Sequence, residues 1–182
     1  ARKFWETGVS VDPYAVVLDC YEHGGQVWSV SGAGMQCRWD TARGAGVLIP
    51  DDEIRALIDE RKFAYAFGDI QQRGDRWLVY RDYSFGFTQD PEFDSWSDAW
   101  EYLCAFAAEH AEHRTPAMES EGFYRSCSAL AKGVLEEYNQ WLAGDCYATV
   151  VEIFTKQDGE WVLQDEDSCW GYVGENYAKQ EL

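Results

Sequence analysis

The C-terminal third of the chain, from Ala129 onward, places the tightest limits on the fold, because it predicts a helix followed by an antiparallel hairpin. Apolar residues recur on one helical face from 129 to 142, and Gly144 is placed to end the helix. Two runs rich in β-branched and aromatic residues, 147–155 and 161–163, then flank Asp158-Gly159. This dipeptide is a strong signal for a two-residue hairpin turn.

The same patterns predict helices and antiparallel strands in the rest of the chain. A hairpin is expected from strands at 14–21 and 26–31, with further strands at 63–68 and 76–81 and a strand that follows a tight turn at Gly44-Ala45-Gly46. Helices are expected at 51–62 and 95–113, and irregular segments at 68–74, 82–94 and 117–128. We therefore expect one α+β domain over residues 1–182, with a mainly antiparallel sheet and at least three packed helices.

The composition is that of a folded, soluble protein. Hydrophobic residues make up 46% of the 182 residues and aromatic residues 16%, enough for one substantial core. We expect a cytoplasmic protein, because the chain has neither an apolar run of membrane-spanning length nor a signal-peptide pattern. The six cysteines are widely scattered and form no CxxC pair, which favours reduced thiols.

The net charge is the outlying property, at −18 for pH 7. Direct binding to nucleic acid is not expected, because that interaction requires clustered cations. An acidic protein can instead attract a basic partner, or it can simply remain soluble. Spread evenly, this charge would be roughly five-fold sparser than that of DNA. A DNA mimic would therefore have to gather its carboxylates on one face.

The helix expected at 95–113 offers such a face. Asp98, Glu101, Glu109 and Glu112 fall within an arc of about 80°, opposite an apolar face that includes Trp96, Trp100, Leu103, Ala107 and Ala111. No Lys or Arg interrupts this segment before Arg114, so the face carries charges of a single sign. A solvated face is the simpler interpretation of such a stripe, and partner binding is the functional one.

Two further acidic groups extend the candidate surface. One precedes the helix, and the other lies just before the C-terminal Trp-Gly segment. The predicted partner-binding residues are Asp90, Glu92, Asp94, Asp98, Glu101, Glu109, Glu112, Asp165, Glu166 and Asp167.

Catalytic signatures are weak. Cys169 beside Asp167 and His23 with Asp40 are the best candidates for a thiol-dependent or histidine-dependent enzyme. The acidic surroundings of Cys169 would disfavour the reactive thiolate, and a histidine in a turn is usually only solvated. We therefore expect no catalytic residue, and a small enzyme remains an alternative.

No cofactor or metal is expected either. The His110 and His113 pair lacks the spacing of zinc hydrolases, and Asp165-Glu166-Asp167 lacks the alternation of a calcium loop. Gly44-Ala45-Gly46 lacks the third glycine of a dinucleotide-binding fingerprint.

Two stretches resemble proteins of mobile genetic elements. Glu137-Tyr138-Asn139-x-Trp141-Leu142-x-Gly144-Asp145-x-Tyr147, followed by Asp167-Ser168-Cys169-Trp170-Gly171-Tyr172-x-Gly174, is similar to the ending of an uncharacterised family carried by phages and conjugative plasmids. Glu22-His23-Gly24-Gly25 and Arg38-Trp39-Asp40 with Gly44-x-Gly46 resemble the front of that family.

The resemblance implies a setting rather than an activity, because small acidic proteins of mobile elements often block host defence. Taken with the charge, it predicts an anti-CRISPR or antirestriction protein. Such a protein would bind a basic, nucleic-acid-binding surface of a host defence complex by mimicking DNA. A soluble accessory protein, with Trp170-Gly171 serving only packing and backbone turning, is the other alternative.

Overall fold

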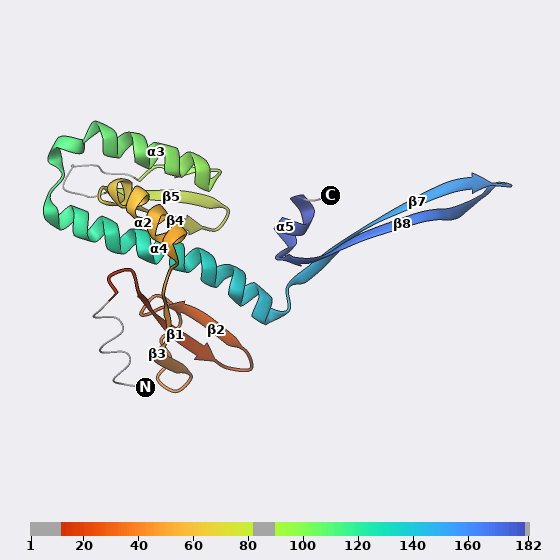
Figure 1. Ribbon diagram of the computed structural model, residues 1–182, viewed down its shortest axis with the longest axis horizontal. Coiled ribbons are helices and arrows are strands. Elements are labelled where there is room, and N and C mark those ends of the chain that lie inside the picture. The colour runs from red at the N-terminus through yellow and green to blue at the C-terminus, as the bar shows by residue number, and fades with distance from the viewer. Residues whose placement is uncertain (1–11, 82–89, 181–182) are drawn as a thin grey trace. The chain divides into compact units, whose positions relative to one another are not determined.

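The computed structural model describes residues 12–81 and 90–180 and has the predicted α+β architecture. The chain divides into two compact units, each built from two separated segments (Figure 1). The first unit comprises residues 1–17 and 46–132, and the second comprises 18–45 and 133–182. Within the described residues, three small sheets accompany helices that include the three expected. A single domain stays a prediction, since neither unit is one continuous stretch.

The first unit packs helices against a three-stranded antiparallel sheet of order β4-β5-β6 (Figure 1). Its elements are α2 (Asp52–Tyr65), β4 (Gly68–Arg73), β5 (Arg76–Arg81), β6 (Glu92–Phe93), α3 (Trp96–Glu109), the 3-10 helix η2 (Ala111–His113) and the first part of α4 (Pro116–Ala143). The core is formed by Ala64, Tyr65, Ala66, Phe67, Ile70, Val79, Ala99, Leu103, Phe106 and Ala107. This core leaves the opposite side of α3 in solvent.

Three predictions in this unit are wrong. Residues 63–65 end helix α2 instead of starting a strand, because Ala64 and Tyr65 are buried in the core. The polar segment 68–74 is largely strand β4, whose last three residues are exposed and tolerate polar side chains. The expected connector 117–128 belongs to helix α4. The expected irregular segment 82–94 contains β6, and its residues 82–89 lie outside the described part of the chain.

Helices α2 and α4 approach each other closely at Gly122. A Cβ atom at this position would lie 2.3 Å from the Lys62 carbonyl oxygen and 2.6 Å from the Ala66 nitrogen. One turn further along α4, the buried Ser126 hydroxyl donates a hydrogen bond to the Ile58 carbonyl oxygen at 3.1 Å. Small side chains therefore let the two backbones meet. Because small residues occupy this contact, the apolar periodicity that predicts a helix is weak in this part of α4.

Replacement of Gly122 by alanine should destabilise the first unit by about 2 kcal/mol, because the added methyl group meets backbone atoms that cannot rotate away. Gly133 is the matched control on the same helix, since a Cβ there has no neighbour within 4 Å. Alanine at 133 should stabilise the chain by up to about 1 kcal/mol through higher helix propensity. Urea unfolding of both variants measures the difference. Equal stability of the two variants would contradict the close approach.

The second unit contains a three-stranded sheet and a long two-stranded hairpin (Figure 1). The sheet has the order β2-β1-β3, and β1 begins two residues before the boundary of the unit. The elements are β1 (Val16–Glu22), β2 (Gln26–Val30), β3 (Thr41–Leu48), the last part of α4, β7 (Cys146–Gln157), β8 (Glu160–Val173) and α5 (Glu175–Gln180). Both predicted hairpins are confirmed. The tight turn expected at Gly44–Gly46 lies inside β3, so this strand begins earlier than expected.

The carboxylate of Asp19 organises the loop between β2 and β3. It is only 1% exposed and accepts hydrogen bonds from the Ser31 hydroxyl, the Gln36 amide, and the backbone N–H groups of Gly32 and Gly44. Gly44 has a positive φ of 60°, which a glycine adopts without strain and which lets its N–H meet the carboxylate inside the strand. Gly44, which the sequence pattern assigned to a turn, therefore binds a buried charge instead.

Asp19 should stabilise the chain in a pH-dependent manner. Burial alone would raise its pKa, but the four hydrogen bonds together outweigh burial and lower the pKa from 3.8 to about 2. A lowered folded-state pKa contributes about 2 kcal/mol that is fully present above the ordinary value and is lost as the pH falls through about 2.

Asp19→Asn should therefore cost about 2 kcal/mol at neutral pH, because the amide NH₂ would face other donors. The deficit should shrink at pH values approaching 2. Urea unfolding across this pH range measures it, with the exposed Glu22→Gln as a control of nearly unchanged stability. An Asp19→Asn variant as stable as the parent at pH 7 would contradict this role.

The end of α4 is joined to strand β2 by the side chain of Asn139. Its amide oxygen accepts a hydrogen bond from the Trp28 N–H at 2.8 Å, and its NH₂ group donates to the Trp28 carbonyl oxygen at 2.8 Å. The side-chain amide thus pairs with the backbone much as another strand would, and it ties the helix to the sheet within the second unit.

Candidate partner-binding surfaces

Helix α3 presents an acidic row to solvent. Ser95 begins the helix as N-cap: its hydroxyl accepts from the Asp98 N–H at 3.1 Å and lies 2.7 Å from the Asp98 carboxylate. Asp98, Glu101, Glu109 and Glu112 are all exposed, while Leu103 and Ala107 on the other side are fully buried. Trp96 and Trp100 are half-buried and stack on each other, with the Arg61 guanidinium about 5 Å from both ring centroids (5.1 and 5.4 Å).

The row is shorter than a continuous helix over 95–113 would make it. Helix α3 ends at Glu109, and Glu112 follows in the 3-10 helix, where Ala111 is exposed rather than buried. Helical rise places Asp98 about 16 Å from Glu109. Within the described residues, no Lys or Arg pairs with Asp98, Glu101 or Glu109, so the single-sign character predicted for the row holds there.

The acidic residues before α3 are engaged within the first unit. Arg76 on β5 forms an ion pair with Asp94, and its Nε atom lies 3.9 Å from a Glu92 carboxylate oxygen. The Asp90 carboxylate accepts a 3.4 Å hydrogen bond from the Arg81 N–H. These contacts hold β6 and its neighbours to β5, and Arg76 partly neutralises the charge of Glu92 and Asp94.

The third acidic group, Asp165, Glu166 and Asp167, lies on strand β8 of the hairpin. Asp165 lies opposite Ile153, Glu166 opposite Glu152 and Asp167 opposite Val151. Because side chains alternate along a strand, Glu166 points to one face and its two neighbours to the other. The three consecutive carboxylates predicted as one patch therefore belong to two surfaces.

We call one of these surfaces the tryptophan face. It combines alternate residues of β7 with their register partners on β8, across an irregularity between Ile153 and Phe154. Three contacts agree with the assignment on the two sides of this irregularity: Lys156 lies over the Trp161 ring, Phe154 and Trp161 line one hollow, and the Trp170 Nε1 group donates to the Ser168 hydroxyl at 3.3 Å. The face consists of Ala148, Val150, Glu152, Phe154, Lys156, Trp161, Leu163, Glu166, Ser168 and Trp170.

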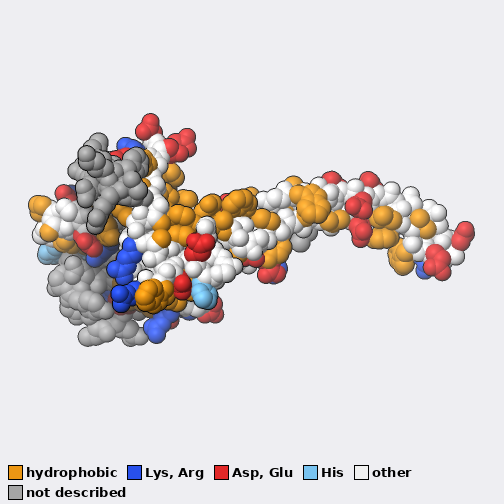
Figure 2. Space-filling view, turned by 90° about the horizontal axis from the view of Figure 1, so that it is seen from below, with side chains coloured by type: hydrophobic (Ala, Val, Ile, Leu, Met, Phe, Trp, Pro, Cys, Tyr) orange, Lys and Arg blue, Asp and Glu red, His pale blue; other side chains and the backbone are white. Residues whose placement is uncertain are grey.

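Both faces of the hairpin expose large apolar side chains. Trp161 is 68% exposed and Trp170 76%, and Val150, Phe154 and Leu163 each keep two fifths or more of their surface in solvent. Figure 2 shows hydrophobic and acidic side chains interleaved along the hairpin. Exposed apolar surface on this scale marks interaction sites in soluble proteins. Sequence reasoning missed this surface, because an apolar strand is normally a buried one.

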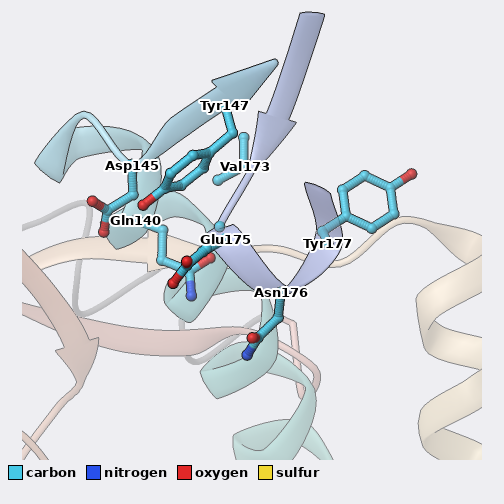
Figure 3. Close-up of a pocket in the computed structure, with 8 residues that line it drawn as sticks. Gln140, Asp145, Tyr147, Val173, Glu175, Asn176 and Tyr177 are labelled. Carbon is cyan, nitrogen blue, oxygen red and sulfur yellow. The ribbon is translucent and has the colours of Figure 1, made fainter. Parts of the chain in front are cut away.

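A polar cavity of about 410 Å³ lies at the base of the hairpin, where α4 ends and α5 begins (Figure 3). Gly174 closes it on one side: its N–H donates to the Asp145 carbonyl oxygen at 2.8 Å, and a Cβ there would lie 2.6 Å from the Gln140 side-chain oxygen. The ring of Tyr177 points away from Gln140 and Asp145 in Figure 3. The lining is made of Gln140, Asp145, Tyr147, Val173, Gly174, Glu175, Asn176 and Tyr177.

The side chains that line this cavity are mainly carboxylates, amides and phenols, so it offers several hydrogen-bonding groups. No group of three or more His, Cys, Asp or Glu side chains suited to a metal ion occurs in the part of the chain that is described.

The structure brings together the predicted pair His23 and Asp40, whose ring nitrogen and carboxylate lie 3.3 Å apart. It adds Cys37, whose thiol donates to the same carboxylate at 3.4 Å. The thiol thus contacts the carboxylate instead of the imidazole. The His23 side chain is 72% exposed at the tip of the β1–β2 hairpin. The order of these groups does not suit nucleophilic catalysis.

Cys169, the other enzymatic candidate, is exposed on β8 opposite Thr149, on the same face as Asp167. His110 is the C-cap residue of α3; its Nδ1 atom lies 2.9 Å from the Phe106 carbonyl oxygen, and the centroid of its ring is 6.3 Å from that of His113.

Comparisons of the chain with family models, with curated proteins and with solved structures give no match. The resemblance to phage and plasmid proteins therefore stays a prediction. Over residues 12–81 and 90–180, no helix combines the length and apolarity that a membrane span requires.

Thiol labelling should separate the six free cysteines by exposure. Cys146 and Cys169 are exposed and should react with a maleimide at similar rates at pH 7. Cys20 and Cys127 are buried, and burial raises the pKa of Cys127 to about 11, so both should react only after unfolding. Mass spectrometry of peptides measures each rate. A Cys169 rate about 100-fold above that of Cys146 would instead indicate an activated thiol and favour the enzymatic alternative.

Proposed function

We propose that this chain is an acidic inhibitor that occupies a basic, nucleic-acid-binding surface of a host defence complex in the host cytoplasm. It would act as an anti-CRISPR or antirestriction protein by competing with DNA. The acidic row on α3, with Asp98, Glu101 and Glu109 exposed and unpaired with any described Lys or Arg, is the observation that supports this proposal.

The number of charges per unit length of the row is of the same order as that of a single DNA strand. Three carboxylates occupy about 16 Å of helix, and about five phosphates occupy the same length of one DNA strand. The row would attract a cluster of lysines and arginines, release their counterions and speed the encounter. Because Leu103 and Ala107 hold the other side of α3 in the core, the carboxylates are presented on a rigid support.

Charge reversal on α3 provides the test. Glu101→Lys combined with Glu109→Lys should weaken capture of host nucleic-acid-binding proteins by about 10-fold or more at low salt. The matched control is Glu136→Lys with Glu137→Lys on the exposed side of α4, which changes the net charge by the same amount. Capture from a host lysate on the immobilised chain, followed by competition of the captured protein against labelled duplex DNA, measures both.

Salt gives a second readout. Capture by the parent chain should fall by at least about 10-fold between 50 and 200 mM salt, as for phosphate contacts. Equal losses in the two double variants would support the accessory-protein alternative, in which only total charge matters. Capture that stays flat with salt would rule out mimicry of a polyanion.

A further inference from the structure

The tryptophan face of the β7–β8 hairpin combines exposed aromatic rings with an unfavourable pair of like charges. Glu152 and Glu166 lie directly opposite each other in the register. Like charges in directly opposed positions destabilise a strand pair. Among the described residues, neither glutamate has an ion-pair partner, although Lys156 lies four residues from Glu152 on the same strand and contacts Trp161 instead.

Apolar groups flank this glutamate pair along the hairpin. Phe154 and Leu163 form the next pair toward the turn, and Phe154 lines a shallow hollow of about 450 Å³ together with Trp161. Val150 lies on the other side of the pair, at 47% exposure. The face thus alternates an apolar region, two carboxylates and a second apolar region, all open to solvent.

An isolated two-stranded hairpin is marginally stable in water, and this one buries neither face. A partner that covers the tryptophan face would remove apolar surface from water and supply the missing counter-charge. The face itself indicates the chemistry of that partner: a cation between Glu152 and Glu166, with apolar side chains beside it.

A second copy of the chain does not fit this requirement. The tryptophan face carries two carboxylates, Glu152 and Glu166, against the single cation Lys156, which already lies over Trp161. Packing two such faces together would bring four carboxylates together with two lysines and would bury at least two carboxylates without a cation. Charge complementarity therefore favours a basic protein segment over self-association.

We propose that the tryptophan face binds a basic amphipathic segment of a partner protein, with an arginine inserted between Glu152 and Glu166. Arginine suits the position because its planar guanidinium pairs with carboxylates and stacks on aromatic rings, and Phe154 is the next residue of β7 on this face. Apolar side chains of the same segment occupy the hollow beside Phe154. The inference deepens the proposed function by naming a second contact with a basic partner, and it uses residues that the α3 row does not.

A synthetic peptide tests the proposal with the full chain. The probe is a ten-residue peptide that repeats Leu-Ser-Arg-Ser, so that leucine and arginine share one face of an extended strand. Its control replaces each arginine by citrulline, the neutral isostere. Fluorescence anisotropy of labelled peptide at low salt measures the dissociation constant. The arginine peptide should bind at least about 10-fold more tightly than the citrulline peptide.

Two matched double variants locate the site. Glu152→Gln with Glu166→Gln should weaken binding of the arginine peptide by about 10-fold or more. Asp165→Asn with Asp167→Asn removes the same charge from the opposite face and should change binding by less than about 3-fold. Thermal unfolding of the glutamine double variant should occur at the same or a higher temperature than that of the parent, because repulsion is relieved. A loss of binding then cannot be attributed to misfolding.

Several outcomes would overturn the inference. These are equal losses in the two double variants, equal binding of the citrulline peptide, no binding of either peptide at millimolar concentration, or a chain that sediments as a dimer and becomes monomeric on Trp161→Arg. Glu101→Lys with Glu109→Lys should leave peptide binding within about 3-fold. Loss of host-protein capture in that variant with intact peptide binding would support both proposals. Intact capture would remove the function proposed for α3 and leave the hairpin site standing.

Discussion

A two-stranded hairpin without a covering layer determines how this chain can meet other molecules. Backbone pairing between β7 and β8 fixes which side chains share a face, and no third strand or helix in the described residues buries either face along most of its length. The register therefore has functional consequences: it separates Glu166 from Asp165 and Asp167, and it sets Glu166 against Glu152. A register shift of one residue in either strand would move the side chains of that strand to the opposite face of the hairpin.

The two candidate surfaces rest on different physics. The row on α3 is backed by a packed core, so its carboxylates act mainly through long-range attraction that salt weakens. The tryptophan face combines apolar area with two carboxylates, so its binding would depend on desolvation and on local pairing as well. A basic partner that met both would gain fast capture from the first surface and slow release from the second.

Much of the fold could be predicted from local chemistry, whereas the exposure of the hairpin could not. Asp158-Gly159 and the Ser95 cap were readable because their geometry is set by a few neighbouring atoms. The helical segment around Gly122 and the polar strand from Gly68 were missed, because small or polar residues there reflect contacts with distant elements. Helical periodicity correctly predicted that Asp98, Glu101 and Glu109 are exposed on α3. The separation of the β8 carboxylates onto two faces could not be predicted, because the strand was expected to stop at Leu163 and instead continues to Val173.

The bond between Trp28 and Asn139 joins residues 111 positions apart, and it has a consequence for how the chain is made. During synthesis the first two strands leave the ribosome long before their helical partner, and the hairpin follows later still. The second unit cannot finish folding until more than a hundred further residues have been synthesised, and until then β1 and β2 lack their contact with α4. Loop closure over this distance is slow compared with local hairpin formation. Completion of this unit therefore requires that the chain has been synthesised beyond Asn139.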